Sequence, residues 1–152
     1  MPDTPDTHRA TPETILAFDF GLRRIGVAVG QTVTSSANPL GVVANSPGGP
    51  DFDAISRIIE EWRPTRLVVG MPMHADGQPG EMQAHVENFV RELWRYQLQV
   101  DTIDERYTSL EAEEALKKAR ASGARGRISK EAIDSAAAVF IAERFLTGRT
   151  NV

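Results

Sequence analysis

The stretch that decides the fold is ILAFDFGLRRIGVAVG, Ile15–Gly30. Residues 15–19 and 24–30 form two apolar, strand-like runs, and only four residues separate them. A connection this short joins antiparallel neighbours, because parallel strands need a crossover of a dozen or more residues. Asp19 ends the first run, at a position where an apolar residue would cost less free energy to bury. We therefore treat Asp19 as the first candidate for a functional residue.

The composition is that of a single water-soluble domain. The 152 residues fit one domain, and a chain of this length can bury about 68–70% of its unfolded surface without a metal or a disulfide. The absence of cysteine excludes thiolate catalysis and sulfur-ligated zinc. No apolar run approaches the roughly 18 residues of a membrane span. Residues 1–13, rich in Pro, Thr and Asp, predict a disordered tail rather than a signal peptide. We expect a cytoplasmic protein with one domain over residues 14–152.

After the first hairpin the chain alternates between strands and helices. Residues 39–44 can form a third strand, and NSPGGP, residues 45–50, is a turn cluster. Asp51 can cap a helix that Pro64 ends, and the run 66–70 lacks polar alternation, as in a strand buried on both faces. The apolar residues of that helix have helical spacing; they are Phe52, Ile55, Ile58, Ile59 and Trp62.

The second half of the chain continues this alternation. A second helix precedes a strand at 98–103; its predicted buried stripe is Met82, Val86, Phe89, Val90 and Leu93, with Trp94 as an optional member. Thr108 and Glu111 have capping-box spacing for a third helix, and Ser129 opens the last one. An antiparallel start followed by this alternation predicts an α/β domain with a mixed sheet and helices on both faces.

Acidic residues occupy positions where a sheet of this kind binds ligands. Asp19 ends the first strand, and Asp134 lies early in the last helix. Asp104 and Glu105 follow the last strand, and strand parity does not choose between them, because they point to opposite faces. If the first and last strands run parallel, their carboxyl ends share one edge, where α/β sheets bind ligands. Carboxylates gathered there repel each other, and without Cys or a His cluster their oxygens favour Mg²⁺ or Mn²⁺ as the neutralising cation.

Such a site suits hydrolysis of a phosphodiester. Two divalent cations roughly 3.5–4 Å apart can stabilise the attacking and leaving oxygens, with water as the nucleophile. The net charge of −4 does not indicate nucleic-acid binding, but residues 117–130 include six basic residues and no acidic residue. Candidates for phosphate contact are Arg23, Arg24, Arg106, Arg125, Arg127 and Lys130.

Each of these features also has a plain explanation when it is taken singly. Asp19 can be a turn residue before glycine, and Asp134 can compensate a helix dipole. A basic stretch is usually a solvated face. The hypothesis of a metal site therefore depends on the acids lying together in space.

Four motifs in order resemble one family. LAFDFGLRRIGVAVG, LVVGMPMHADG, DERYTSLEAE and IDSAAAVFIAERF are similar to the YqgF-type (RuvX-like) family of Holliday-junction-resolvase-like proteins and pre-16S rRNA nucleases, over residues 15–145. The resemblance implies an RNase H-like fold with five strands in the order 3-2-1-4-5, the second antiparallel to the rest. It also implies divalent-metal-dependent cleavage, with the acidic positions on Asp19, Glu105 and Asp134, and thus favours Glu105 over Asp104.

The resemblance implies a bacterial, cytoplasmic nuclease that matures the 5′ end of ribosomal RNA. A resolvase of branched DNA would keep the same chemistry and require a two-fold dimer, but no self-complementary patch is evident in the sequence. We expect structured RNA or branched DNA as the partner, no membrane, and a monomer or weak homodimer. A non-catalytic nucleic-acid-binding module remains an alternative. An actin-like ATPase is disfavoured, because such proteins bind nucleotide between two domains and 152 residues supply one.

Overall fold

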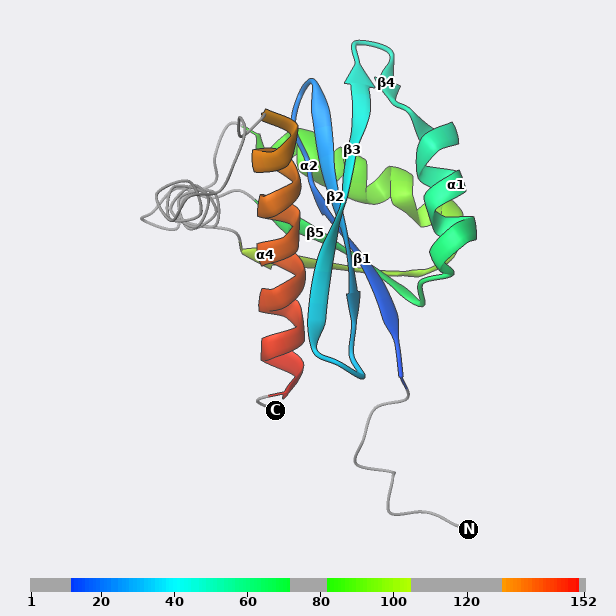
Figure 1. Cartoon of the computed structure of the whole chain (residues 1–152). Coiled ribbons are helices and arrows are strands. Elements are labelled where there is room, and N and C mark those ends of the chain that lie inside the picture. The colour runs from blue at the N-terminus through cyan, green and yellow to red at the C-terminus, as the bar shows by residue number, and fades with distance from the viewer. Residues whose placement is uncertain (1–11, 72–81, 105–129, 151–152) are drawn as a thin grey trace, which may run out of the picture.

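The computed structural model describes residues 12–71, 82–104 and 130–150, with backbone alone at 130–134 and 149–150 (Figure 1). The strands are β1 (Thr14–Asp19), β2 (Arg24–Gln31), β3 (Ser36–Ser46), β4 (Gly49–Pro50), β5 (Arg66–Met71) and β6 (Gln99–Asp104). The helices are α1 (Phe52–Trp62), α2 (Gln83–Leu93), the short 3₁₀ helix η2 (Trp94–Tyr96) and α4 (Lys130–Thr150). These elements form an α/β domain.

The sheet has the predicted mixed topology. Its order is β4-β3-β2-β1-β5-β6, with β1–β2 and β2–β3 antiparallel and β1–β5 and β5–β6 parallel. Without the two-residue strand β4, this is the expected order 3-2-1-4-5 with the second strand antiparallel. The short loop after Asp19 thus returns the chain beside β1, whereas helices connect the parallel strands.

The predicted number of strands and the bounds of the third strand were wrong. The turn cluster forms a hairpin in which Asn45 pairs with Pro50 and Ser46 with Gly49, which adds β4 and extends β3 to Ser46. Gly49 reverses the chain with a φ of +117°, a conformation that glycine adopts at little cost. At its other end β3 begins at Ser36, three residues before the predicted start. Pro39, which has no N–H donor, pairs with Ala28 beside a bulge between Val27 and Ala28 in the β2–β3 register.

Alternate residues of β1 build two separate cores. Leu16 and Phe18 pack in the larger cluster, which α1 and α2 cover. Ile15 and Ala17 pack on the other face with residues of α4. Figure 1 shows α4 running beside β2 and β3, with α1 on the other side of the sheet. The predicted coverage by helices on both faces is therefore confirmed, and β1 is buried on both faces at the centre of the sheet.

The predicted boundaries of α1 and α2 hold closely. The predicted buried stripe of α2 differs from the structure at Trp94. The carboxylate of Asp51 accepts a hydrogen bond from the Ala54 backbone N–H at 3.1 Å, so it caps α1 as predicted. Trp94 was an optional member of the stripe, but its side chain is 59% exposed. The α-helix ends at Leu93, and Trp94 begins the following 3₁₀ turn, on the edge of the stripe that Val86, Phe89 and Leu93 form.

Several predictions fall outside the described residues: the disorder of residues 1–11, the helix cap at Thr108 and Glu111, and the opening of α4 by Ser129. Glu13, placed at the end of the predicted tail, is tied to the domain. Its backbone N–H donates to Thr32 Oγ1 at 2.9 Å, and its carboxylate accepts from Thr65 Oγ1 at 2.9 Å. Within the part of the chain that the structure describes, no helix is long and apolar enough to cross a membrane.

Candidate active site

Asp19 lies at the carboxyl end of β1, on the face of the sheet that α4 covers. Alternation along the strand gives it the same face as Ile15 and Ala17. Its partner in β2 is Gly26, and the next position of β5 beyond the Phe18–Val69 pair is Gly70. Both neighbouring strands therefore have a glycine at the position next to Asp19.

Ser135 fixes the beginning of α4 over the same end of the sheet. Its side chain is buried, with 4% of the residue exposed, and Oγ donates to the Val27 carbonyl at 3.4 Å and accepts from the Gly41 N–H at 3.3 Å. Val27 pairs with Phe18, the residue before Asp19. The backbone of Asp134, next to Ser135 in α4, is therefore held close to the level of Asp19 along β1. The side chain of Asp134 is outside the described part of the chain.

The register of β6 gives Asp104 the opposite face of the sheet from Asp19. Asp104 pairs with Met71, and Met71 packs in the cluster under α1 and α2. Ile103, by contrast, packs in the cluster under α4. Alternation thus places Asp104 away from α4 and counts against it as a partner of Asp19. Glu105, the residue that the family resemblance favoured, lies outside the described residues.

The predicted metal ligands Asp19, Glu105 and Asp134 are all carboxylates. Carboxylate oxygens are the ligands that Mg²⁺ and Mn²⁺ prefer, so these residues fit a hard divalent cation. Asp19 is the one acid of the predicted triad whose side chain the structure describes. Among the side chains described, no three of His, Cys, Asp and Glu lie close enough together to hold a metal ion. The convergence of Asp19, Glu105 and Asp134 thus stays a prediction.

Two of the predicted phosphate contacts are described, both beside Asp19 in the sequence. Arg23 lies in the β1–β2 loop with an exposed side chain, and Arg24 begins β2. Arg24 has the same strand parity as Gly26, so it lies on the α4 face together with Asp19. Arg106, Arg125 and Arg127 are outside the described residues, and Lys130 begins α4 with backbone alone described.

The sequence analysis missed one residue that orders this end of the sheet. Ser135 stands in the run IDSAAA, where a hydroxyl among alanines on a helix that packs against a sheet signals a polar contact to a strand. That contact is the pair of hydrogen bonds to β2 and β3 described above. Ser135 is thus a positioning residue for the early turns of α4.

Solved structures identify the fold. Among solved structures, the chain is similar to the RuvC resolvase of Thermus thermophilus in complex with Holliday junction substrate, with a TM-score of 0.54 and 16% identity over 92% of this chain and 97% of that chain. It is also similar to the yeast mitochondrial Holliday junction resolvase Ydc2, with a TM-score of 0.50 and 8% identity over 90% and 78% of the two chains. The fold is therefore RNase H-like, as the resemblance implied.

The family follows from the sequence comparisons. The family model "RuvX: Holliday junction resolvase" matches residues 13–148, and the chain belongs to this family. A protein of Paraburkholderia xenovorans named "Putative pre-16S rRNA nuclease" is 45% identical over 89% of this chain and 88% of its own length. A Burkholderia lata protein of the same name is 44% identical over 90% and 91% of the two chains. The predicted nuclease family is confirmed, and the chain belongs to a family of hydrolases that act on nucleic acids.

Proposed function

We propose that this protein hydrolyses phosphodiester bonds of precursor ribosomal RNA with the help of divalent cations, in maturation of the 5′ end of 16S rRNA. The observation that carries the proposal is the position of Asp19, a carboxylate between two glycines at the carboxyl end of the central strand. The name shared by its close relatives supplies the substrate.

The proposed roles follow from the chemistry of the residues. Asp19, Glu105 and Asp134 would hold Mg²⁺ or Mn²⁺, which supplies an activated water and stabilises charge on the phosphate oxygens. Ser135 positions the backbone beside Asp134 through its bonds to β2 and β3. Arg24, on the face of Asp19, together with Arg23, Arg106, Arg125, Arg127 and Lys130, would contact the phosphate backbone. Such contacts orient the substrate without reading its sequence.

The test is cleavage of an RNA that carries the natural 5′ extension of 16S rRNA. Wild-type protein is expected to shorten it with Mn²⁺ or Mg²⁺ and to stop when chelator is added. Asp19→Asn keeps the side-chain size and removes the negative charge that a cation needs, so cleavage should fall by at least 100-fold. Asp53→Asn is the matched control, because Asp53 is an exposed acid in the first turn of α1. Equal cleavage by wild type and Asp19→Asn would refute the mechanism.

A second candidate function is resolution of branched DNA. The description of the matching family model as a Holliday junction resolvase favours it. Symmetric cutting of two strands requires two active sites related by a two-fold axis. The same preparations should therefore be tested on a four-way DNA junction, with the mass of the protein–junction complex measured by light scattering. Paired symmetric cuts by a dimer, with no cut in the RNA, would replace the first proposal by this one.

A further inference from the structure

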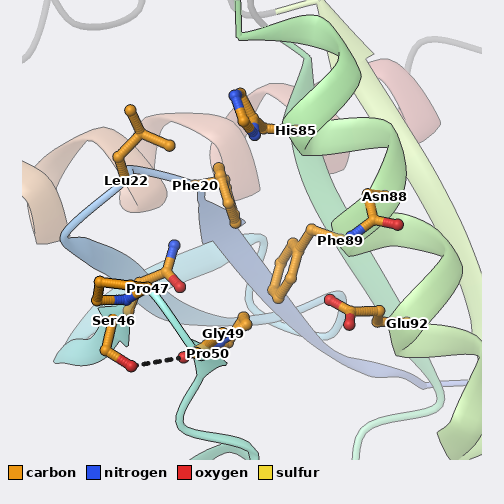
Figure 2. A pocket seen from close by; sticks show the side chains of 12 residues that line it. Phe20, Leu22, Ser46, Pro47, Gly49, Pro50, His85, Asn88, Phe89 and Glu92 are labelled. Atoms are coloured by element: carbon orange, nitrogen blue, oxygen red, sulfur yellow. Dashed lines mark hydrogen bonds between the residues drawn. The ribbon is translucent and has the colours of Figure 1, made fainter.

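A pocket of about 450 Å³ opens at the same end of the sheet as Asp19 but on the opposite face (Figure 2). Its walls come from the β1–β2 loop, the β3–β4 hairpin and one side of α2; the residues that matter here are Phe20, Leu22, Phe89, His85, Asn88 and Glu92. This volume lies within the range of roughly 300–1,000 Å³ that is common for sites of small organic groups. The metal site proposed above does not use any of these residues.

The floor of the pocket is aromatic. The rings of Phe20 and Phe89 lie with centroids 5.1 Å apart at an interplanar angle of 41°. Leu22 extends the apolar surface at the rim, and 58% of this residue is exposed although it is large and apolar. Figure 2 shows Leu22 and Phe20 on one side of the pocket and Phe89 between Phe20 and Glu92. Phe89 is only 1% exposed and supports the Phe20 ring, so a flat apolar ligand would stack on Phe20 beside Leu22.

One edge of the pocket is polar and has unused hydrogen-bonding capacity. His85, Asn88 and Glu92 follow one another along α2 at spacings of three and four residues, so they share one face of the helix over roughly 10 Å. Within the described part of the chain, none of these three side chains makes a hydrogen bond or an ion pair. In Figure 2 the Glu92 carboxylate is directed toward Phe89 and the hairpin.

The charge of the pocket selects against a phosphate. Among the described residues that line the pocket there is no Lys or Arg, and Glu92 contributes a negative charge. A ligand with N–H donors on one edge and a flat aromatic face would satisfy both the Glu92 carboxylate and the Phe20 ring. A guanine base has this combination, because its N1–H and exocyclic amino group lie side by side and match the two oxygens of a carboxylate.

The position of the pocket relates it to the candidate active site. Asp19 and Phe20 are consecutive, yet Asp19 lies on the α4 face and Phe20 packs in the cluster on the α1 and α2 face. A nucleic-acid strand that crosses this end of the sheet can present a phosphate on one side and an unstacked base on the other. Stacking of unpaired bases on aromatic side chains is the usual way in which single-stranded RNA is recognised.

We propose that this pocket binds an unpaired guanine of the single-stranded part of the substrate, close to the phosphodiester that is cut. This inference rests on the proposed function, because it assumes that a nucleic-acid strand passes Asp19. The carboxylate and the apolar floor of the pocket are complementary to a guanine base. Because the pocket lies beside Asp19, we assign that base to a nucleic-acid strand rather than to a free nucleotide.

The test is equilibrium binding of fluorescent single-stranded RNA in chelator, where no metal-dependent cleavage occurs. Two probes are compared: oligouridine, and the same strand with one central guanosine. Wild-type protein should bind the guanosine probe about tenfold more tightly, the size expected for one stacked and hydrogen-bonded base. Leu22→Ala and Glu92→Gln should each remove most of this preference. Both side chains lie at the protein surface or its edge, so the variants are expected to fold, and circular dichroism checks this.

Matched controls separate the pocket from general effects. Val33→Ala removes another exposed apolar side chain, 73% exposed in the turn between β2 and β3, and Glu61→Gln removes an exposed acid of α1. Both should keep the guanosine preference. Equal binding of the two probes by wild type, or an unchanged preference in Leu22→Ala and Glu92→Gln, would overturn the proposal. Competition by free guanosine monophosphate as strong as that by the RNA strand would overturn the assignment to a strand, and competition by a lysine-rich peptide alone would identify a protein partner instead.

The outcomes for the pocket and for the nuclease activity are distinguishable. Cleavage by wild type without a guanosine preference would remove the pocket proposal and leave the proposed function intact. A guanosine preference that Glu92→Gln abolishes, in a protein that cuts no RNA with Mg²⁺ or Mn²⁺, would support the pocket and refute the proposed catalysis.

Discussion

The Ser135 hydroxyl of α4 donates a hydrogen bond to the carbonyl of Val27 in β2, 108 residues earlier in the chain. Because the same oxygen accepts from Gly41 in β3, one buried side chain joins the last helix to two strands beside a β-bulge. The bulge leaves backbone groups that the regular ladder does not pair. Ser135 thus stabilises the irregular part of the sheet and orients the turn of α4 that contains Asp134.

Ser135→Ala should destabilise the protein and impair its activity. Loss of a buried partner for two backbone groups is expected to lower the free energy of unfolding by about 1–2 kcal/mol. Urea denaturation measures this change, and Thr34→Ala, in an exposed turn, is the control. If Ser135 positions Asp134, cleavage at saturating metal should fall in Ser135→Ala well below wild type even at temperatures where the variant is fully folded. Full activity in the folded variant would leave Ser135 with a role in stability alone.

Binding of the metal to Asp19 should be visible without any substrate. A ligand that binds the folded state at a hundredfold excess over its Kd stabilises it by about 2.7 kcal/mol, which raises the melting temperature of a domain of this size by roughly 5–10 °C. Mn²⁺ should therefore raise the Tm of wild type and of Asp53→Asn, but have little effect on Asp19→Asn. An equal rise in all three proteins would show that the ion binds elsewhere.

Gly30→Ala tests how closely α4 packs on the sheet. A Cβ at this position would lie 3.1 Å from Ile15 Cγ1 and 3.3 Å from Leu146 Cδ1. Both contacts are tighter than ordinary packing, and Ile15 and Leu146 belong to the buried cluster under α4. We expect a loss of about 1–3 kcal/mol in the free energy of unfolding, as for other overpacked cores. Gly148→Ala is the control, since nothing lies within 4 Å of its added Cβ.

A comparison of Leu93→Ala with Trp94→Ala tests the packing at the end of α2. Leu93 is fully buried in the larger cluster, so Leu93→Ala should cost about 2–5 kcal/mol of unfolding free energy. Trp94→Ala removes a larger side chain, yet its exposure predicts a change within about 0.5 kcal/mol. Thermal or urea unfolding of the two variants compares them directly. A greater loss of unfolding free energy for Trp94→Ala than for Leu93→Ala would contradict the burial of Leu93 and the exposure of Trp94 at the end of α2.

Arg66 joins β5 to β6 and to the residue before β1. Its guanidinium Nη1 lies 2.6 Å from Asp101 Oδ2, its Nε lies 3.4 Å from Glu13 Oε1, and it stacks over the Phe145 ring at 5.6 Å. Arg66→Gln should lower the free energy of unfolding by about 1–2 kcal/mol, because charge-assisted bonds in a half-buried site are lost. A loss below about 0.3 kcal/mol would show that solvent already screens the network.

The pH dependence of this network follows from the pKa of Arg66. Partial burial works to lower this pKa, but the hydrogen bond and charge of Asp101 and the charge of Glu13 outweigh it and raise the pKa above its ordinary value. A raised pKa gives stability that is complete below the unfolded-state pKa and lost only as the pH rises through the folded-state pKa. For arginine this window lies above the pH range in which proteins are studied. The stability difference between wild type and Arg66→Gln should thus be the same at pH 7 and pH 9, and a marked fall at pH 9 would contradict this assignment.

Much of the fold could be predicted because local signals and the global pattern agree. The short connection after Asp19 requires antiparallel β1 and β2, and the apolar run LVVG at 67–70 is typical of a strand covered on both sides. The cap at Asp51 and the stop at Pro64 define α1 within one or two residues. Each signal acts within a few residues, where chain geometry leaves few alternatives.

The sequence by itself determined the order of strands and helices, the candidate acids and the family. Only the tertiary structure decided which face each residue occupies. The register of β6 against β5 turns Asp104 away from α4, the hairpin at Gly49 adds a sixth strand, and Trp94 lies exposed in the 3₁₀ turn. The pocket beside Phe20 likewise exists only because α2 and the β3–β4 hairpin meet there. The spacing of apolar residues shows which side of a single helix or strand is buried. What that side contacts depends on the strand register and on packing between elements that are distant in the sequence.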